Sequence, residues 1–165
     1  MKFLKIYFAV VFFCFLTGSN LNLVAQSQST LSFGQSSTIP VAGLVNDILY
    51  SKNGKYTFFS KENSLIIYNL QSTKYKEIFE LQKGYKMVRI RVTEGTVILT
   101  SIPDPNGINA NDPTKHDAIW GDKSKGGKYT KLVMEDDGSL VLYNGTAQGE
   151  NGDVIWKVET QLENR

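Results

Sequence analysis

The stretch KLVMEDDGSLVLYNG, Lys131–Gly145, places two apolar runs on either side of a short acidic segment. The runs Leu132–Met134 and Leu140–Tyr143 are rich in strand-forming residues. Between them, residues 135–139 contain the Asp-Gly pair that tight turns favour. The pattern predicts a β-hairpin. It also raises a question of function, because an acidic turn either only reverses the chain or also binds a ligand.

The same unit of apolar run, polar turn and apolar run occurs three times. Residues 58–69 (FFSKENSLIIYN), 90–101 (IRVTEGTVILTS) and 133–144 (VMEDDGSLVLYN) align without a gap. Each unit is followed by a short apolar segment with a large aromatic residue, and these residues are Phe79, Trp120 and Trp156. Three β units that recur along the chain predict a body with pseudo-threefold symmetry, in which the three aromatic side chains pack together at the centre. A platform on which sugars stack is the alternative role for the tryptophans.

The rest of the chain agrees with an all-β protein. No window after residue 26 shows sustained apolar residues at helical spacing, whereas short runs of Val, Ile, Leu, Phe, Tyr and Thr are bounded by Gly, Asn, Asp and Ser. The segment Pro103–Asp117, with three prolines and several Asn, Asp and Gly residues, is expected to be a surface loop inserted in the second repeat. Residues 26–37, rich in Ser and Gln, are expected to form a flexible lead-in.

The first 25 residues are expected to be a signal peptide. Lys2 and Lys5 precede an apolar run of 11 residues, 6–16, which is shorter than the roughly 20 residues that span a bilayer. Small residues ending at Ala25 then resemble a cleavage site, and an uncleaved anchor is the alternative. Export followed by cleavage predicts a secreted domain, 26–165, with no inserted membrane segment; the sequence leaves periplasm, cell surface and medium open.

Cleavage also changes the charge. The whole chain has 18 basic and 16 acidic residues, and loss of Lys2 and Lys5 leaves 16 of each. A nearly neutral chain without a basic stripe does not predict binding of nucleic acid. The single cysteine lies in the apolar run of the leader, so the mature domain is expected to be stabilised by packing and strand pairing, without disulfides.

These segments resemble the bulb-type, mannose-binding lectin family. The resemblance is carried by residues 49–59 (LYSKNGKYTFF), by residues 126–145 (GGKYTKLVMEDDGSLVLYNG) and by the triplets AIW and VIW, and it extends over residues 31–160. It implies a β-prism II fold, in which three four-stranded antiparallel sheets are related by pseudo-threefold symmetry. It also implies binding of mannose-type glycans without a cofactor, and a homodimer formed by exchange of terminal strands, for which residues 153–160 are the candidate.

The family's sugar-binding pattern, Gln-x-Asp-x-Asn-x-Val-x-Tyr, matches the third repeat in part. Its amide and carboxylate groups would hold vicinal hydroxyls, its valine would contact ring carbons, and its tyrosine hydroxyl would complete the set. The corresponding residues here are Glu135, Asp137, Ser139, Val141 and Tyr143. Asp137, Val141 and Tyr143 match, whereas Glu135 replaces Gln and loses a donor, which should weaken a mannose-type ligand or change the preference.

The other two repeats depart further from the pattern. In the first repeat the positions are Ser60, Glu62, Ser64, Ile66 and Tyr68, and the last four form a weaker second candidate site. In the second repeat they are Val92, Glu94, Thr96, Ile98 and Thr100, without the amides and the tyrosine, and no sugar binding is expected there.

Other chemistry has little support. His116, the single histidine, lies in the predicted loop and is expected to be solvated rather than a general base. The neighbouring carboxylates Asp136 and Asp137 are expected to diverge, whereas a glycosidase needs two carboxyl groups facing one bond across about 5–10 Å. The oxygen-rich residues 104–112 lack the spacing of a calcium loop. The sequence therefore predicts a lectin-like protein that is not an enzyme and holds no metal. The alternative is a β-prism interaction or structural module that has lost sugar binding.

Overall fold

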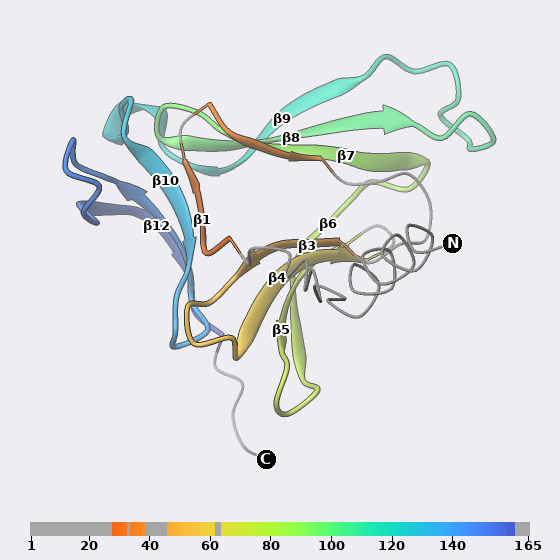
Figure 1. The fold of residues 1–165 in the computed structure, drawn as a ribbon. Coiled ribbons are helices and arrows are strands. Elements are labelled where there is room, and N and C mark those ends of the chain that lie inside the picture. Colours follow the sequence, from red (N-terminus) through yellow and green to blue (C-terminus); the bar gives the residue numbers. More distant parts are fainter. Residues whose placement is uncertain (1–27, 33, 39–45, 62–63, 161–165) are drawn as a thin grey trace, which may run out of the picture.

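The computed structural model describes residues 28–32, 34–38, 46–61 and 64–160, and the predicted leader lies outside them (Figure 1). Within these residues the chain forms strands and one short 3-10 helix. The strands are β1 (Thr30–Ser32), β2 (Ser36–Thr38), β3 (Asn46–Tyr50), β4 (Tyr56–Lys61), β5 (Ser64–Asn69), β6 (Tyr75–Glu80), β7 (Tyr85–Val92), β8 (Thr96–Pro103), β9 (Lys115–Gly121), β10 (Thr130–Met134), β11 (Leu140–Asn144) and β12 (Asp153–Val158). The helix, η1, spans Lys123–Lys125.

The strands form three four-stranded sheets, and every pairing is antiparallel. Sheet I has the order β3-β4-β5-β6, sheet II the order β2-β7-β8-β9, and sheet III the order β1-β10-β11-β12. The sheets stand around a common interior (Figure 1). The predicted all-β class with three four-stranded antiparallel sheets is confirmed, and the arrangement is consistent with β-prism II.

The N-terminal strands each complete a different sheet. β1 pairs with β10, β2 with β7 and β3 with β4. The prediction of a flexible lead-in over residues 26–37 is therefore wrong for residues 30–32 and 36–37, which lie in β1 and β2. These strands have three residues each, too few to show alternation, and their conformation is set by backbone hydrogen bonds to an existing sheet edge.

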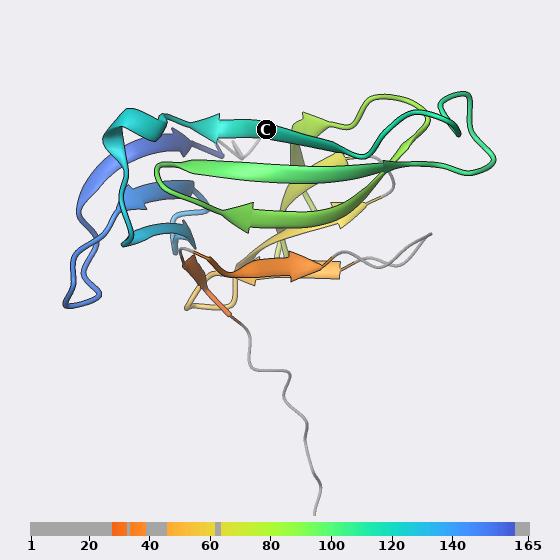
Figure 2. The same cartoon turned by 90° about the horizontal axis from the view of Figure 1, so that it is seen from above.

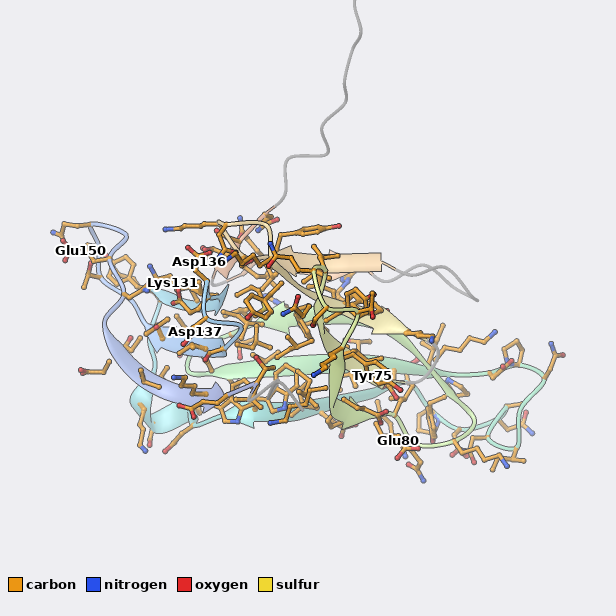
Figure 3. The ribbon with its side chains drawn as sticks, turned by 90° about the horizontal axis from the view of Figure 1, so that it is seen from below. Tyr75, Glu80, Lys131, Asp136, Asp137 and Glu150 are labelled. Carbon is orange, nitrogen blue, oxygen red and sulfur yellow. The ribbon has the colours of Figure 1, made fainter. Side chains whose placement is uncertain are left out.

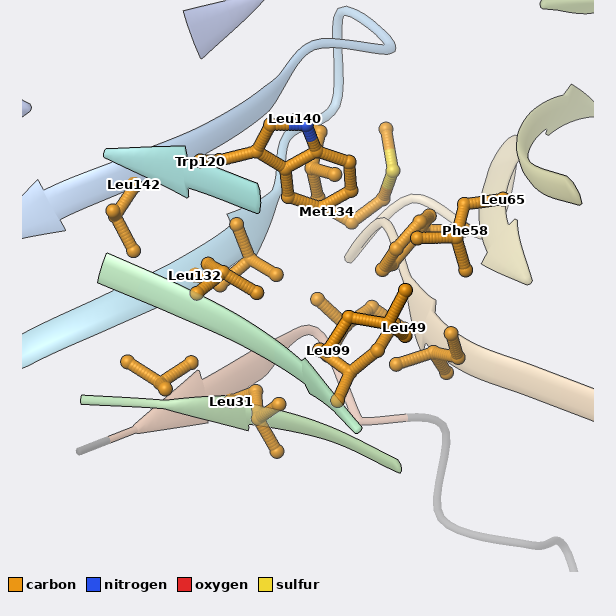
Figure 4. Packing of buried hydrophobic residues seen from close by; sticks show 14 of the residues in the cluster. Leu31, Leu49, Phe58, Leu65, Leu99, Trp120, Leu132, Met134, Leu140 and Leu142 are labelled. Carbon is orange, nitrogen blue, oxygen red and sulfur yellow. The ribbon is translucent and has the colours of Figure 1, made fainter. Parts of the chain in front are cut away.

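The core lies where the inner faces of the sheets meet (Figure 4). Trp120 of β9 stacks on Trp156 of β12 with ring centroids 4.7 Å apart and an interplanar angle of 13°. Phe79 of β6 meets the Trp120 ring edge-on at 6.4 Å. The three aromatic side chains that end the repeats therefore converge, as predicted, and each such pair contributes about 0.5–1.5 kcal/mol beyond its buried area.

The hairpin of sheet III has a turn one residue longer than the turns of sheets I and II. The gapless alignment of the repeats is therefore wrong by one residue on the first strand of each hairpin. In sheet III, Met134 faces Leu140 across the hairpin. In sheets I and II the equivalent pairs are Ser60 with Leu65 and Val92 with Val97, which leave one residue fewer for the turn. The side chains of Ser60 and Val92 are consequently buried. The residues that occupy the place of Glu135 are the next ones along, Lys61 and Thr93.

The connection between β8 and β9 covers residues 104–114 and projects beyond the body of the prism (Figure 2). Side chains hold it against the start of β7. Tyr85 donates a hydrogen bond to Asp112 (2.5 Å), and Asn109 donates one to the carbonyl of Lys83 (2.9 Å). Lys86 forms an ion pair with Asp104 at 3.4 Å. The pKa of Asp104 is lowered, and the largest cause is the hydrogen bond that its carboxylate accepts from the backbone N–H of Asn106.

Candidate functional site

A cleft of about 440 Å³ opens on the outer face of sheet III, beside the β10–β11 turn. We call it the sheet III cleft. Figure 3 shows Asp136 and Asp137 at this turn, away from Tyr75 of sheet I. The five residues of the third-repeat motif line the cleft, together with four others: Glu135, Asp136, Asp137, Ser139, Val141, Tyr143, Asn151, Val154 and Lys157. The turn and strands β11 and β12 thus bring the predicted residues to one place.

The turn is closed by its own hydrogen bonds. The N–H of Glu135 donates to the carbonyl of Ser139 (2.9 Å), and the N–H of Gly138 donates to the carbonyl of Glu135 (3.1 Å). One carboxylate oxygen of Asp137 accepts the N–H of Ser139 at 2.8 Å. Gly138 has φ +88°, a conformation that glycine adopts at low cost. The turn therefore uses one oxygen of the Asp137 carboxylate. The other oxygen remains available to a ligand.

Asp136 connects this turn to the neighbouring sheet. Its carboxylate accepts the backbone N–H of Asn53 at 2.7 Å, and its carbonyl accepts the Asn53 side-chain amide at 3.0 Å. Asn53 lies in the turn between β3 and β4 of sheet I. These two bonds join residues 83 positions apart and fix the acidic turn relative to the prism. Asp136 and Asp137 therefore have different roles, as their expected divergence suggested.

Tyr143 and Glu135 form the polar wall of the cleft. The Tyr143 hydroxyl donates to Oε1 of Glu135 at 2.9 Å, and the Asn151 amide donates to the same oxygen at 3.3 Å. Burial, and then the hydrogen bond to Glu135, raise the pKa of Tyr143 to about 12. Lys131 supports the loop that carries Asn151 by donating to the carbonyl of Gly149 (2.6 Å). The Tyr143 hydroxyl and the Asn151 amide thus donate to the same oxygen of Glu135.

The floor of the cleft is more enclosed than the motif suggests. Val141 is only 1% exposed and Ser139 only 3% exposed. Val141 has Lys157 as its cross-strand neighbour on the same face. The side chain that offers apolar surface to a ligand is instead Val154 of β12, which is 54% exposed. Val141 therefore forms the floor of the cleft, and the apolar side chain exposed at its wall is that of Val154.

The cleft carries a formal charge of −2, because three carboxylates line it against one ammonium group. That ammonium, on Lys157, is paired with Glu159 at 2.9 Å. The pKa of Lys157 is raised, and the largest cause is its hydrogen bond to Glu159. The positive charge is therefore partly neutralised by a carboxylate of its own, and the electrostatic potential of the cleft is set by its acidic residues.

Asn151, Val154 and Lys157 were not found from the sequence. They lie in the β11–β12 loop and in β12, and no motif spacing relates them to the hairpin. The signal that marks them is strand pairing, because the fourth strand of each sheet borders the face on which the motif lies.

A smaller cleft of about 190 Å³ occupies the corresponding face of sheet I. Of the second candidate site, Ser64, Ile66 and Tyr68 line it, and Glu62 lies outside the described residues. The other lining residues are Phe59, Lys61, Tyr75 and Glu77. Lys61 is there in place of the buried Ser60 because of the shorter turn. The Phe59 and Tyr68 rings meet edge-on at 6.0 Å.

Sheet II presents a different face. Arg89 and Arg91 lie in register with Thr100 and Ile98 across the hairpin. His116 is exposed in strand β9, rather than in the predicted loop, and its Nδ1 is 3.1 Å from the Thr100 hydroxyl. This surface has neither the amides nor the tyrosine of the sugar-binding motif at the corresponding positions. Among the described residues, no three His, Cys, Asp or Glu side chains are grouped to hold a metal ion. In the same part of the chain, no helix has the length and apolar character to cross a membrane.

No protein-family model matches the sequence, and no curated protein matches it either. Among solved structures, the chain is similar to the Japanese Marasmius oreades lectin, with a TM-score of 0.50 and 21% sequence identity. The match covers 82% of this chain and 93% of that lectin. At this identity the similarity concerns the fold, which the two chains share over most of their length.

Proposed function

We propose that this protein is a secreted carbohydrate-binding protein, not an enzyme, whose principal site is the sheet III cleft. The observation that carries the proposal is the meeting of five motif positions in one cleft, with the Tyr143 hydroxyl bonded to Glu135 at 2.9 Å. The fold shared with a fungal lectin supports the class of function.

The proposal that the protein is secreted rests on the leader, residues 1–25. N-terminal sequencing of the exported protein tests it.

The chemistry of the cleft suits a pyranose with vicinal hydroxyls, of which mannose-type glycans are our first candidates. Sugar hydroxyls donate to the outer oxygens of Glu135 and Asp137, while the Ser139 hydroxyl can donate or accept. The exposed isopropyl group of Val154 offers a surface to the ring carbons. Hydrogen bonds to charged groups contribute about 1.5–3 kcal/mol each, and the freedom that a ligand loses on binding offsets much of this, so a single site binds weakly.

Weak sites gain from multivalency. The sheet I cleft, with Ser64, Ile66 and Tyr68, is the second site in this proposal. A homodimer would double the number of sites, and residues 153–160, which include β12, are the segment we propose for its interface. In the structure β12 pairs with β11 of its own chain.

The second candidate function is an interaction module without sugar binding. The observation that favours it is Ile108, a large apolar side chain that is 78% exposed in the β8–β9 connection. The connection is held in place by the Tyr85–Asp112 and Asn109–Lys83 hydrogen bonds, as a contact element would require.

A glycan array with the mature protein separates the two functions. The lectin proposal expects mannoside signals that fall in Tyr143→Phe and Asp137→Asn. The first variant removes a hydroxyl, the second replaces one acceptor oxygen by an amide group, and both keep the shape of the side chain. Ile108→Ser serves as the control and leaves those signals unchanged. An array without any glycan signal, together with loss of partner binding in Ile108→Ser, would instead support the interaction module.

A further inference from the structure

We propose that the sheet III cleft selects sugars that carry a protonated amine, 2-amino-2-deoxyhexoses, over their neutral counterparts. This inference rests on the proposed function of the same cleft and adds the chemical class of its ligand. The reason lies in the hydrogen-bond donors and acceptors of the cleft that are not used within the protein and remain available to a ligand.

The donors of the cleft are largely used within the protein. The Tyr143 hydroxyl and the Asn151 amide both donate to Oε1 of Glu135. The Lys157 ammonium is paired with Glu159. The remaining cleft therefore offers few donors to a ligand, which distinguishes it from a site built on glutamine and asparagine side chains.

The acceptors remain available. Among the described residues, Oε2 of Glu135 and Oδ2 of Asp137 accept no hydrogen bond, because their partner oxygens take the contacts from Tyr143, Asn151 and Ser139. Both residues line the cleft. Two carboxylates that line one cleft favour a ligand that donates several hydrogen bonds and carries a positive charge, and an ammonium group does both.

A second, independent observation is the Ser139 side chain, which lines the cleft without a hydrogen-bond partner among the described residues. Its side chain lines the floor of the cleft although the residue is 3% exposed. Within the described part of the chain its hydroxyl makes no hydrogen bond, while its backbone N–H is taken by Asp137. Because this hydroxyl has no partner within that part of the protein, it is free to bond to a ligand or to water in the cleft.

A sugar ring, rather than a bare cation, fits the remaining surface. Val154 supplies an exposed apolar wall, and the volume of about 440 Å³ holds more than an ammonium group. The described residues show no cluster of three His, Cys, Asp or Glu side chains suited to a metal. The ammonium would lie between Glu135 and Asp137, and the ring would cover Ser139 and contact Val154.

The test compares three ligands that share the mannose ring: methyl α-mannoside, mannosamine and N-acetylmannosamine. Binding to the mature protein is followed by amide chemical shifts in NMR titrations at constant ionic strength. Mannosamine should bind about tenfold more tightly than the two neutral sugars, because its ammonium adds attraction between opposite charges to the hydrogen bonds that hydroxyls also form with the carboxylates. The shifts should map to residues 135–143 and 151–157.

Variants locate the effect. Glu135→Gln and Asp137→Asn each remove one charge and keep an acceptor for Tyr143 or Ser139, so both should fold and lose most of the preference for mannosamine. Glu94→Gln removes the same charge from the exposed β7–β8 turn of sheet II and should leave the preference unchanged. Ethanolamine, an amine without a ring, should produce no comparable shifts.

The outcomes separate the two proposals. Binding of methyl α-mannoside with no tighter binding of mannosamine overturns the inference and leaves the proposed function intact. Absence of shifts with all three sugars overturns both. An equal loss of preference in Glu94→Gln, or equal shifts with ethanolamine, would reduce the effect to nonspecific charge attraction and also overturn the inference.

Discussion

The hydroxyl of Tyr143 donates a hydrogen bond of 2.9 Å to the carboxylate of Glu135, eight residues earlier in the chain. Tyr143 belongs to β11, and Glu135 directly follows β10. The bond couples a strand to the acidic turn. Burial in the first instance, and then this bond and the negative charge of Glu135, raise the pKa of Tyr143 and keep it protonated. One interaction therefore sets both the shape of the cleft wall and the charge that a ligand meets.

This bond gives a prediction for alkaline titration. Tyr143 has a folded-state pKa of about 12 against an ordinary value of 10.0. Its contribution to stability is therefore fully present below pH 10 and is lost as the pH rises toward 12. Absorbance of tyrosinate should show one group fewer titrating near pH 12 in Tyr143→Phe. In Glu135→Gln the same group should titrate at lower pH; an unchanged high pKa there would mean that burial alone causes the shift.

The link between Asp136 and Asn53 should matter for stability rather than for binding. Asp136→Ala removes the acceptor of the 2.7 Å bond from the Asn53 N–H. We expect it to lower the free energy of unfolding by about 1 kcal/mol, measured by urea denaturation. Asp136→Asn loses the same charge and keeps an acceptor, so it should cost clearly less. Equal losses in the two variants would show that charge, rather than the cross-sheet bond, stabilises the turn.

Alanine substitutions at Gly138 and Gly149 distinguish backbone strain from steric overlap, because the two glycines have similar backbone angles but different surroundings. Gly138 and Gly149 have φ of +88° and +84°. A Cβ at Gly138 would lie 2.5 Å from the Thr160 hydroxyl and 2.8 Å from the Tyr56 ring, whereas nothing lies within 4 Å at Gly149. Gly149→Ala should therefore cost only the left-handed conformation, about 1–2 kcal/mol. Gly138→Ala should cost more, and equal thermal stabilities of the variants would contradict the close packing of the turn.

The sequence indicated the architecture in two ways. The repeats, each made of two apolar runs around a polar turn and followed by a large aromatic residue, predicted three β units with Phe79, Trp120 and Trp156 at their centre. The three four-stranded sheets were expected from the resemblance to bulb-type lectins. Strands β1 and β2 were missed, because three residues are too few for a pattern and their pairing is set by the sheet edge that receives them.

The candidate site was predictable in its residues but not in its geometry. Motif spacing brought Glu135, Asp137, Ser139 and Tyr143 together correctly. It did not indicate that Val141 is buried, that Val154 forms the exposed wall, or that one turn is a residue longer than the others. Such features depend on strand register and on a neighbouring strand, and neither is encoded in the hairpin's own sequence.

The central position of Trp120 leads to the last prediction. Its ring contacts Phe58, Phe79 and Trp156, which come from sheets I and III, and it is the most buried of the three repeat-ending aromatics. Trp120→Ala should lower the free energy of unfolding by about 3–5 kcal/mol, because it removes the group that fills the space between sheets. Trp156→Ala should cost less, since its partly exposed ring leaves a space that solvent can enter. The chain has two tryptophans, so the fluorescence of the remaining one reports urea unfolding in each variant. If Trp156→Ala destabilised the protein as much as Trp120→Ala, the two rings would act as one unit and Trp120 would not be the centre of the plug.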